Sequence, residues 1–426
     1  MQSVVVRMLT GLPIAMATVA LAATPALAVA GRLDRSFSGD GRVTAFPKGA
    51  MGFAVAIDAK RRILVAGPTL GAGTNFAIAR FLPNGSLDRH FGGGDGRVTT
   101  DLGGSDYAFD LALGSRGRIV VAGERDRPSG SAMALAVYGP RGALDRRFSK
   151  DGIAFVRFGK RFQGANAVAV GRGGKIVIAG STSNGETSRW ALARLLPGGP
   201  RDRRFGGDGR VTLDLSSSAE QINDIAIVRR GAIVAAGSAE VGLTPRIAIA
   251  RVRASGRLDR IFGNDGTKTT DVARGADAAD GVTIQPDGKL VVVGHVANQG
   301  KADWGVLRYG RNGRLDDSFG GHGIRILRFG SDYEFASDSA VQPNGRIVVV
   351  GRIRRKDNDQ FGVVRLKPNG AYDLNFSKDG RLVVDFGGES DTARAVVLQP
   401  NGRIVVAGDA SDRGSRRIGV ARLLAS

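Results

Sequence analysis

The hydrophobic positions of this chain fall in short runs separated by Gly-rich turns, and no stretch keeps the period of a helix. One segment shows four such runs, at Ala108 to Leu113, Ile119 to Gly123, Met133 to Tyr138 and Ile153 to Phe155. Each run has the length and composition of a β-strand. Pairs such as Asn344-Gly345 between the first two runs favour type I′ hairpins, in which both central residues take positive φ. The pattern therefore predicts antiparallel units of four strands.

The four-strand unit recurs seven times along the chain. An Asp-x-x-Phe signature, usually preceded by Leu, marks each unit, with aspartates at Asp34, Asp88, Asp145, Asp202, Asp259, Asp316 and Asp373. These aspartates are 54 residues apart at the first step and 57 residues apart at each of the next five steps. A fixed period of this size is typical of stacked or radial repeats. Seven equal four-stranded units predict an all-β fold, a seven-bladed β-propeller.

An open solenoid is the alternative to a closed ring, and the two ends of the repeat region decide between them. Ser426 falls where Asn84 lies in its unit, and Gly31 falls where Gly85 lies, so the two ends join in register. We therefore expect Arg42 to Phe46 to be the outer strand of a blade whose other strands lie at 393–398, 403–407 and 417–424. A solenoid would instead carry distinct capping repeats at its ends.

The first thirty residues have a different character from the repeats. An apolar stretch from Leu9 to Leu27 precedes two small-x-small sites, Ala26-Leu27-Ala28 and Ala28-Val29-Ala30. We interpret residues 1–30 as a secretory signal peptide, with cleavage after Ala30, and residues 31–426 as a single propeller. A membrane anchor is the alternative, but prolines interrupt a run that is already short for a span of about 20 residues. We expect a secreted protein, extracellular or loosely associated with the cell envelope.

Several strings of the repeats resemble the delta-sixty repeat family of exported bacterial β-propeller proteins, a domain of unknown function. They include Leu-Gln-Pro-Asn-Gly-Arg-Ile-Val-Val-Ala-Gly at 398–408 and Phe-Gly-Gly-Asp-Gly-Arg-Val-Thr at 205–212. A third string, Phe-Ala-Ile-Ala-Arg-Phe-Leu-Pro-Asn-Gly-Ser-Leu-Asp, occupies 76–88. The resemblance implies a propeller and export, and it carries no catalytic residues.

The chain is strongly basic, with 61 Lys and Arg against 40 Asp and Glu and a formal charge of +21. Such a charge favours anionic partners, for example an envelope or extracellular polymer, a glycan or an acidic protein surface. Few aromatic residues lie among the bases, so we expect no specific nucleic-acid binding. The chain has no cysteine, and its core needs no disulfide at this length. We expect a monomer without a transmembrane segment after signal cleavage.

The repeated charges have a structural interpretation. The aspartate of each Asp-x-x-Phe signature is expected to accept backbone hydrogen bonds in its turn. Six units carry an Arg at the end of the third strand, close enough to pair with that aspartate. These are Arg80, Arg194, Arg251, Arg308, Arg365 and Arg422. The seventh unit has Val137 and keeps Asp145, which indicates that the pairing is not essential. Trp190 and Trp304 occupy a position that is apolar in every unit and are expected in the core.

Acidic residues at the start of the innermost strands are the main candidates for binding. One aligned position holds Asp106, Gln163, Glu220, Asp277, Glu334 and Asp391, and alternate units add Asp110, Asp224 and Asp338 slightly further along. Clustered carboxylates at a channel mouth favour a cation, so calcium or the amino groups of a glycan or peptide are possible guests. The alternative is that each acid caps its own loop. One sector is richest in acids, with Glu334, Asp357, Asp359, Glu389, Asp391, Asp409 and Asp412.

The opposite face is expected to be basic, through the first-hairpin turns and the signature loops. Its bases are Lys60, Arg61, Arg62, Arg116, Arg118, Lys175, Arg230, Lys289, Arg346, Arg403, Arg35, Arg89, Arg146, Arg203, Arg204 and Arg260. The chain has three histidines and no nucleophile elbow, zinc spacing or phosphate loop. We therefore expect a non-catalytic binding or scaffold propeller that uses the loops of the acidic face. A carboxylate-based glycan hydrolase or lyase at the channel mouth is the alternative, because glycoside cleavage needs only two acids.

Overall fold

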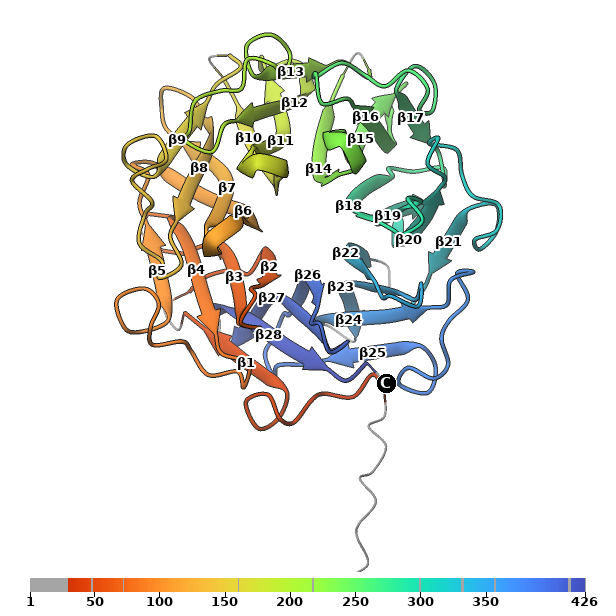
Figure 1. The fold of residues 1–426 in the computed structure, drawn as a ribbon. Helices are drawn as coiled ribbons and strands as arrows, with labels where there is room; N and C mark the ends of the chain where they lie inside the picture. Colours follow the sequence, from red (N-terminus) through yellow and green to blue (C-terminus); the bar gives the residue numbers. More distant parts are fainter. Residues whose placement is uncertain are drawn as a thin grey trace, which may run out of the picture.

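The computed structural model describes residues 30–46, 49–71, 73–159, 161–216, 218–298, 300–330, 333–355, 358–412 and 415–425. These residues form seven four-stranded antiparallel sheets arranged in a ring (Figure 1). The predicted seven-bladed β-propeller is confirmed. The described part of the chain contains no helix with the length and hydropathy needed to cross a membrane.

Each blade runs from the centre of the ring to its edge in chain order. Blade I holds β2 (Ala54–Ile57), β3 (Ile63–Pro68), β4 (Phe76–Phe81) and β5 (Arg97–Thr100). Blade II holds β6 (Ser105–Leu113), β7 (Ile119–Asp126), β8 (Ala132–Tyr138) and β9 (Ile153–Val156). Blade III holds β10 (Gln163–Val170), β11 (Ile176–Ser183), β12 (Ser188–Leu195) and β13 (Arg210–Leu213). Blade IV holds β14 (Glu220–Ile227), β15 (Ile233–Val241), β16 (Thr244–Val252) and β17 (Thr267–Thr270).

The remaining three blades follow the same order, and the last is completed by the first strand of the chain. Blade V holds β18 (Ala278–Ile284), β19 (Leu290–Asn298), β20 (Lys301–Tyr309) and β21 (Ile324–Leu327). Blade VI holds β22 (Phe335–Val341), β23 (Ile347–Arg355), β24 (Asn358–Leu366) and β25 (Arg381–Val384). Blade VII holds β26 (Thr392–Leu398), β27 (Ile404–Asp412), β28 (Ser415–Leu423) and β1 (Arg42–Ala45). Short 3₁₀ turns at Ser115–Gly117, Arg172–Gly174 and Arg229–Gly231 replace the Gly-containing pair in blades II to IV.

The first hairpins of the later blades differ from the type I′ turns expected from sequence. In blade V only Gly288 has positive φ, at 84°, while Asp287 does not. The amide of Gly288 donates to Gln285 O at 2.8 Å, so Pro286 and Asp287 are the central residues of the turn. Proline fixes φ near −65°, which suits a type I turn and excludes a type I′ turn at that position. The glycine then supplies the left-handed residue that follows such a turn.

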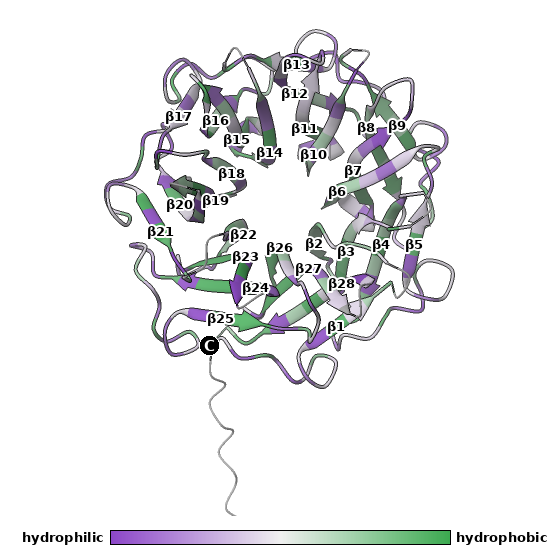
Figure 2. Cartoon of the chain, turned by 180° about the vertical axis from the view of Figure 1, so that it is seen from behind, coloured by the Kyte–Doolittle hydropathy of each residue, from purple (hydrophilic) through white to green (hydrophobic). Residues whose placement is uncertain are grey.

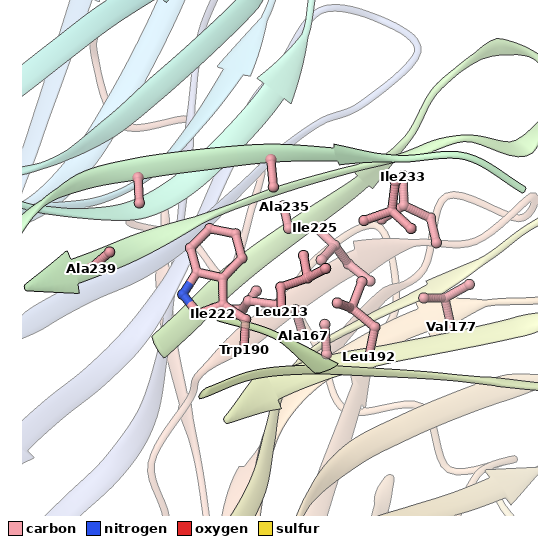
Figure 3. Close-up of a cluster of buried hydrophobic side chains, with 14 of the residues drawn as sticks. Ala167, Val177, Trp190, Leu192, Leu213, Ile222, Ile225, Ile233, Ala235 and Ala239 are labelled. Carbon is pink, nitrogen blue, oxygen red and sulfur yellow. The ribbon is translucent and has the colours of Figure 1, made fainter. Parts of the chain in front are cut away.

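The core lies between the blades, where each sheet packs face to face on the next. Figure 3 shows one such cluster, between blades III and IV, in which Trp190 lies among Leu213, Ile222 and Ala239. Trp190 is fully buried and its indole N–H donates to Ser238 O at 3.1 Å. Trp304 is equally buried, so both tryptophans are core residues, as predicted. The outer strand β25 is hydrophilic at its first residue, Arg381, and hydrophobic over the three residues that follow (Figure 2).

The ring is closed by hydrogen bonding between the two ends of the chain. Strand β1 pairs antiparallel with β28 from Arg42↔Ala421 to Ala45↔Ile418, and Figure 1 shows these strands side by side. The expected sharing of the last blade is confirmed. Gly31 N donates to Leu424 O at 2.9 Å, which matches the bond from Gly85 N to Leu82 O at 2.9 Å in blade I. The two chain ends together therefore rebuild the turn that is continuous in the other blades.

Candidate functional site

In six blades the innermost strand turns one residue toward the centre of the ring by means of a β-bulge. In blade I, β2 and β3 pair without a register shift, and Phe53 takes the equivalent position. In blade II, Ala108 pairs with Gly123 and Asp110 pairs with Ala122, which leaves Phe109 as the extra residue. The neighbouring strand makes room with glycine, because a Cβ on Gly123 would lie 1.8 Å from Tyr107 O. In every blade, a Cβ added to the equivalent glycine would lie within 2.0 Å of a carbonyl oxygen. These glycines are Gly67, Gly123, Gly180, Gly237, Gly294, Gly351 and Gly408. Bulges commonly re-aim side chains next to functional sites.

The six bulge residues and Phe53 of blade I line one cavity of about 690 Å³ at the centre of the propeller. They are Phe53, Phe109, Asn166, Asn223, Asp280, Ser337 and Arg394. Their chemistry changes around the ring, although the backbone repeats. Blades I to IV contribute two phenylalanines and two asparagines, while blades V and VII contribute charges. A cavity of this size accommodates a small molecule or the end of a polymer chain.

The charged sector of the cavity lies in blades V, VI and VII. In blade V, the bulge residue Asp280 lies 3.2 Å from Nδ1 of His295, measured from Oδ2. In blade VII the bulge residue is the base, and Nε of Arg394 lies 2.8 Å from Oδ2 of Asp409. His295 and Asp409 both follow the bulge glycine of their blade. These two blades therefore hold the same pair of positions with opposite polarity.

Blade VI departs from this pairing, because its bulge residue is the uncharged Ser337. Its post-glycine residue, Arg352, lies over the ring of Phe335 at 4.6 Å from the centroid. The guanidinium reaches Asp359 only at 3.5 Å, and its buried Nε has no hydrogen-bond partner. His295 contacts the same phenyl ring edge-on, with centroids 5.0 Å apart. Of Arg352, His295 and Arg394, Arg352 therefore lies farthest from its acidic partner.

The opposite side of the cavity is aromatic and amide-lined. The rings of Phe53 and Phe109 meet edge to face with centroids 5.6 Å apart, and Tyr107 stacks on Phe109 at 6.3 Å. Asn166 donates its amide to Ile222 O at 2.7 Å, and Asn223 donates to Ala279 O at 2.8 Å. Each asparagine therefore joins its blade to the next.

Three predicted site residues, Asp110, Asp224 and Asp338, line the same cavity. Each accepts one backbone hydrogen bond from the next residue and another from the innermost strand of the following blade. The second set of bonds comes from Val168 at 2.7 Å, Val282 at 2.7 Å and Val396 at 2.8 Å. The three carboxylates thereby join blades II to III, IV to V and VI to VII.

Burial and mutual repulsion shift the titration of these three carboxyls. Loss of solvent raises the pKa of Asp224 to about 7, against the opposing effect of its backbone hydrogen bonds. Loss of solvent and the neighbouring charge of Asp224 raise the pKa of Asp338 to about 8. The pKa of Asp110 is raised well above its usual value by burial and by the charges of Asp224 and Asp338. The three acids that the sequence predicts to converge thus line one cavity, and their role in binding stays a prediction.

The other five predicted acids lie at or just before the start of the innermost strands, and none of them lines the cavity. Their carboxylates accept amide hydrogen bonds from the loop that leads into their own strand. Leu102 N reaches Asp106 at 2.5 Å, Leu215 N reaches Glu220 at 2.6 Å, Val272 N reaches Asp277 at 2.8 Å, Phe329 N reaches Glu334 at 2.8 Å and Phe386 N reaches Asp391 at 2.8 Å. All five side chains are buried. Their geometry is that of loop caps, the alternative that the sequence left open.

Metal binding finds no assembled ligand set among the described residues. No group of three or more His, Asp or Glu side chains there is positioned to hold an ion. Calcium at the mouth therefore stays a prediction without assigned ligands. Within the acid-rich sector, Asp359 lines the cavity and Asp409 pairs with Arg394. Asp357 and the side chain of Asp412 lie outside the described residues.

The face opposite the cavity mouth carries the repeated charges. In six blades the signature aspartate accepts Nε of the third-strand arginine at 2.7 to 2.9 Å. The same arginine lies over the signature phenylalanine, 4.2 to 4.9 Å from its centroid. It also donates Nη1 to a carbonyl of the next blade, for example from Arg194 to Ala254 O at 2.6 Å. We call this arrangement the Asp-Arg-Phe clasp.

Blade II has no third-strand arginine, and another residue pairs with its signature aspartate. Val137 replaces the arginine there, but Arg118 from the first hairpin lies 3.0 Å from Asp145. Arg118 also donates to Pro197 O of the next blade at 3.1 Å, as the other clasp arginines do. A different residue therefore restores both contacts. Several bases that were predicted to lie on the surface also form ion pairs with the signature aspartates. Lys289, for example, lies 2.7 Å from Asp316.

The residues that sequence reasoning missed are His295, Arg352 and Arg394. Each occupies a position that varies between units while its neighbours repeat, either at the bulge or directly after the bulge glycine. The repeated glycine at the end of the second strand was the available signal. An alignment of the seven units at that glycine would have shown which side chains break the repeat.

Comparison with known proteins gives matches at the level of fold and family. The family described as "Domain of unknown function (DUF5122) beta-propeller" matches residues 61–91, 174–205, 285–319, 342–376 and 399–426. No curated protein matches the sequence.

Solved propellers resemble the chain in fold. A catalytically inactive virginiamycin B lyase from Staphylococcus aureus with quinupristin has 12% identity and a TM-score of 0.50, covering 90% of this chain and 98% of that chain. An ulvan lyase bound to -[GlcA(1-4)Rha3S]- has 11% identity and a TM-score of 0.51, covering 90% and 96%. At these identities the likeness shows the fold alone.

Proposed function

The chain belongs to the delta-sixty repeat family of β-propeller proteins, and we propose that it is an exported, non-catalytic binding module that takes an acidic saccharide into its central cavity. The observation that carries the proposal is the uneven lining of that cavity. Seven equivalent positions, six of them at bulges, hold aromatic and amide side chains in blades I to IV and charged or hydroxyl side chains in blades V to VII. A fold that repeats its backbone has no structural need for this asymmetry, so the lining reflects a ligand.

Arg352 is proposed to hold the acidic group of the ligand. The equivalent pairs in blades V and VII are separated by 3.2 Å and 2.8 Å, whereas Arg352 reaches Asp359 only at 3.5 Å and has the uncharged Ser337 at the bulge position. An anion placed between Arg352 and Ser337 would complete the third pair and engage the Nε that now lacks a partner. Charge-assisted hydrogen bonds from a guanidinium to a carboxylate are among the strongest available to a protein.

The rest of the lining suits a saccharide. Planar amides and carboxylates can bond to adjacent hydroxyl groups, and Asn166, Asn223 and Asp280 present them at neighbouring positions of the ring. The phenyl ring of Phe109 offers an apolar surface for the C–H groups of a sugar ring, while the guanidinium of Arg394 lies over the ring of Phe53, 4.3 Å from its centroid. An acidic peptide would use the arginine but would leave the hydroxyl-directed groups less well matched.

The basic face is proposed to attach the propeller to an anionic envelope polymer. The arginine that directly follows the signature aspartate is exposed in five blades, at Arg35, Arg89, Arg146, Arg203 and Arg260. These side chains lie on one face of the disc, in blades VII and I to IV. They are separate from the clasp arginines. Attachment through them alone would be weak and sensitive to salt, and it would leave the cavity mouth facing outward.

Calorimetric titration with oligogalacturonate and with its methyl ester tests the cavity. The two ligands differ in charge and share the sugar framework, so the acid form is expected to bind at least about tenfold more tightly, as for one charge-assisted bond. Arg352→Gln should remove this preference. Arg314→Gln, an exposed arginine on the opposite face, should leave it intact. Absence of saccharide binding, together with binding of acidic peptides, would overturn the proposal.

One observation favours a second candidate, an enzyme that cleaves such a saccharide. The Asp280 carboxylate and the His295 imidazole form an acid–base pair on the cavity wall, whereas Glu220 is committed to its loop. His295 would remove the proton on the carbon next to the substrate carboxylate. The C–O bond on the adjacent carbon would then break, leaving a carbon–carbon double bond and an alcohol protonated by water. New ultraviolet absorbance from oligogalacturonate, abolished by His295→Gln, would favour this function over simple binding.

A further inference from the structure

The seven blade interfaces share one backbone hydrogen bond, which joins the signature loop of one blade to the third-strand turn of the next. At each interface, the amide one residue after the signature phenylalanine donates to a carbonyl in the third-strand turn of the next blade. The acceptors are Asn84, Arg141, Gly198, Ser255, Asn312, Asn369 and Ala30, at distances from 2.7 to 3.0 Å. Six of these carbonyls belong to continuous turns, and the seventh belongs to the residue just before the expected start of the mature protein.

Ala30 therefore belongs to the interface between blades VI and VII. Its carbonyl accepts the amide of Ser377 at 3.0 Å, and its side chain is 6% exposed within the cluster that contains Phe376. The next residue, Gly31, has a φ of 78° and no room for a Cβ, which would lie 2.7 Å from Ser377 N. Both residues are thus fitted to the joint between blades VI and VII.

We infer that the leader is removed after Ala28, so that the mature protein begins at Val29 and retains Ala30. The sequence offers two sites with small residues at the positions that a signal peptidase reads, Ala26-Leu27-Ala28 and Ala28-Val29-Ala30. Cleavage at the second site would remove the carbonyl that Ser377 uses and would leave that amide without its partner. Cleavage at the first site preserves all seven interface bonds. This inference revises the expected cleavage after Ala30.

The signal peptidase cleaves the chain before it folds, so the fold cannot direct the choice of site during cleavage. The fold can favour one site only over evolution, through selection for sequences that are cleaved where the folded protein is more stable. Ser377 is half-buried, and loss of the acceptor for its amide removes one net hydrogen bond from the interface. It would also weaken the interface that holds the two chain ends together, where no covalent connection compensates. The inference is independent of the ligand of the cavity.

The direct test is the N-terminus of the protein after export. The full-length chain would be expressed in an exporting bacterial host, and the secreted protein would be analysed by intact mass and N-terminal sequencing. The expected sequence is Val-Ala-Gly-Arg, starting at Val29. A mature protein that starts at Gly31 would overturn the inference.

A second test separates the role of Ala30 from the choice of the peptidase. Two proteins with defined starts, at Val29 and at Gly31, would be compared by amide hydrogen exchange. The Ser377 amide is expected to exchange about tenfold faster in the shorter protein, as for the loss of one net hydrogen bond. The Gly320 amide, which donates to Asn369 O at 2.9 Å, serves as the internal control and should not change.

The carbonyl and the side chain of Ala30 can also be distinguished. Ala30→Gly in the protein that starts at Val29 keeps the carbonyl and removes the methyl group, so protection of Ser377 should persist. Equal exchange of Ser377 in the proteins starting at Val29 and at Gly31 would show that the carbonyl is not needed, and the physical basis of the inference would fail.

Discussion

The Asp-Arg-Phe clasps and the central cavity are built on the same seven repeats but use them in opposite ways. Every clasp keeps its aspartate and phenylalanine, and where Val137 replaces the arginine, Arg118 restores both of its contacts. The six bulge positions and their equivalent in blade I instead carry five different residue types. The clasps hold neighbouring blades together, so each loss affects stability. The bulges place side chains in a common cavity, where variation costs little and can create a binding site.

The largest effect should come from breaking the clasp that closes the ring. Asp34 pairs with Arg422 at 2.9 Å, and both side chains are 5% exposed. Asp34→Asn leaves a buried guanidinium without its counter-charge, which should lower the free energy of unfolding by roughly 3–5 kcal/mol. Urea denaturation would measure this loss.

Asp145→Asn is the matched comparison within the same set of clasps. Its partner Arg118 is more exposed, at 17% of the side chain, and it comes from a different strand. We expect a smaller loss of about 1 kcal/mol, as for a partly exposed pair. Equal losses for Asp34→Asn and Asp145→Asn would mean that ring closure places no special demand on its clasp.

The difference between the two regions also explains which features could be predicted from sequence. The period, the turn glycines and the register of the chain ends determine the number of blades and the ring closure. The inner acids Asp110, Asp224 and Asp338 were recognised because they repeat in alternate units. Asp391 and its equivalents were aligned correctly, but an alignment does not show whether a side chain faces the mouth or its own loop.

The cavity residues were harder to predict, because a bulge changes which face a side chain takes. One extra residue in a strand reverses the alternation that follows it, and the sequence of β18 or β22 gives no sign of this. Only the glycine on the neighbouring strand indicates it, through a contact that depends on the pairing. His295 and Arg352 therefore became candidates only when the strands were paired.

A second prediction tests whether the bulge glycines support the cavity. In Gly351→Ala the new Cβ would lie 2.0 Å from Phe335 O, which neither strand can accommodate without moving. We expect a loss of about 2–3 kcal/mol in unfolding free energy, as for an overpacked core, together with weaker ligand binding at the adjacent Arg352. Calorimetry and urea denaturation would report both.

Gly159→Ala is the control for this substitution, because no atom lies within 4 Å of its Cβ position and its φ is not positive. Its stability and binding should match those of the unaltered protein. A Gly351→Ala variant that behaved in the same way would show that the bulge does not depend on glycine.

The smallest effect concerns pH, and it compares the carboxylates of the two regions. Burial raises the pKa of Asp224 to about 7 and of Asp338 to about 8, so the folded protein holds protons that the unfolded chain releases above its usual aspartate pKa. Their stabilising contribution is therefore present below about pH 4 and is lost as the pH rises toward 8.

The clasp aspartates titrate in the opposite direction. Burial would raise the pKa of Asp88, but the amide of His90 and the charge of Arg80 outweigh it and lower the pKa. Such a group stabilises the fold above its unfolded pKa, and this contribution is lost as the pH falls. Stability should therefore be greatest near pH 4. It should fall at lower pH because the clasp aspartates become protonated, and at higher pH because the cavity carboxyls lose their protons.

Urea denaturation of single variants across this pH range would show which carboxylates cause the decline in stability at low pH and which cause the decline at high pH. Asp338→Asn should flatten the decline between pH 6 and pH 8, which we expect to be on the order of 1–2 kcal/mol, and leave the decline at low pH in place. Asp88→Asn should do the reverse. If Asp338→Asn left the alkaline decline unchanged, the cavity carboxylates would be ionised throughout, and the coupling inferred from their burial would be wrong. The comparison is made on slopes, because either substitution also removes a hydrogen-bond acceptor and lowers stability at every pH.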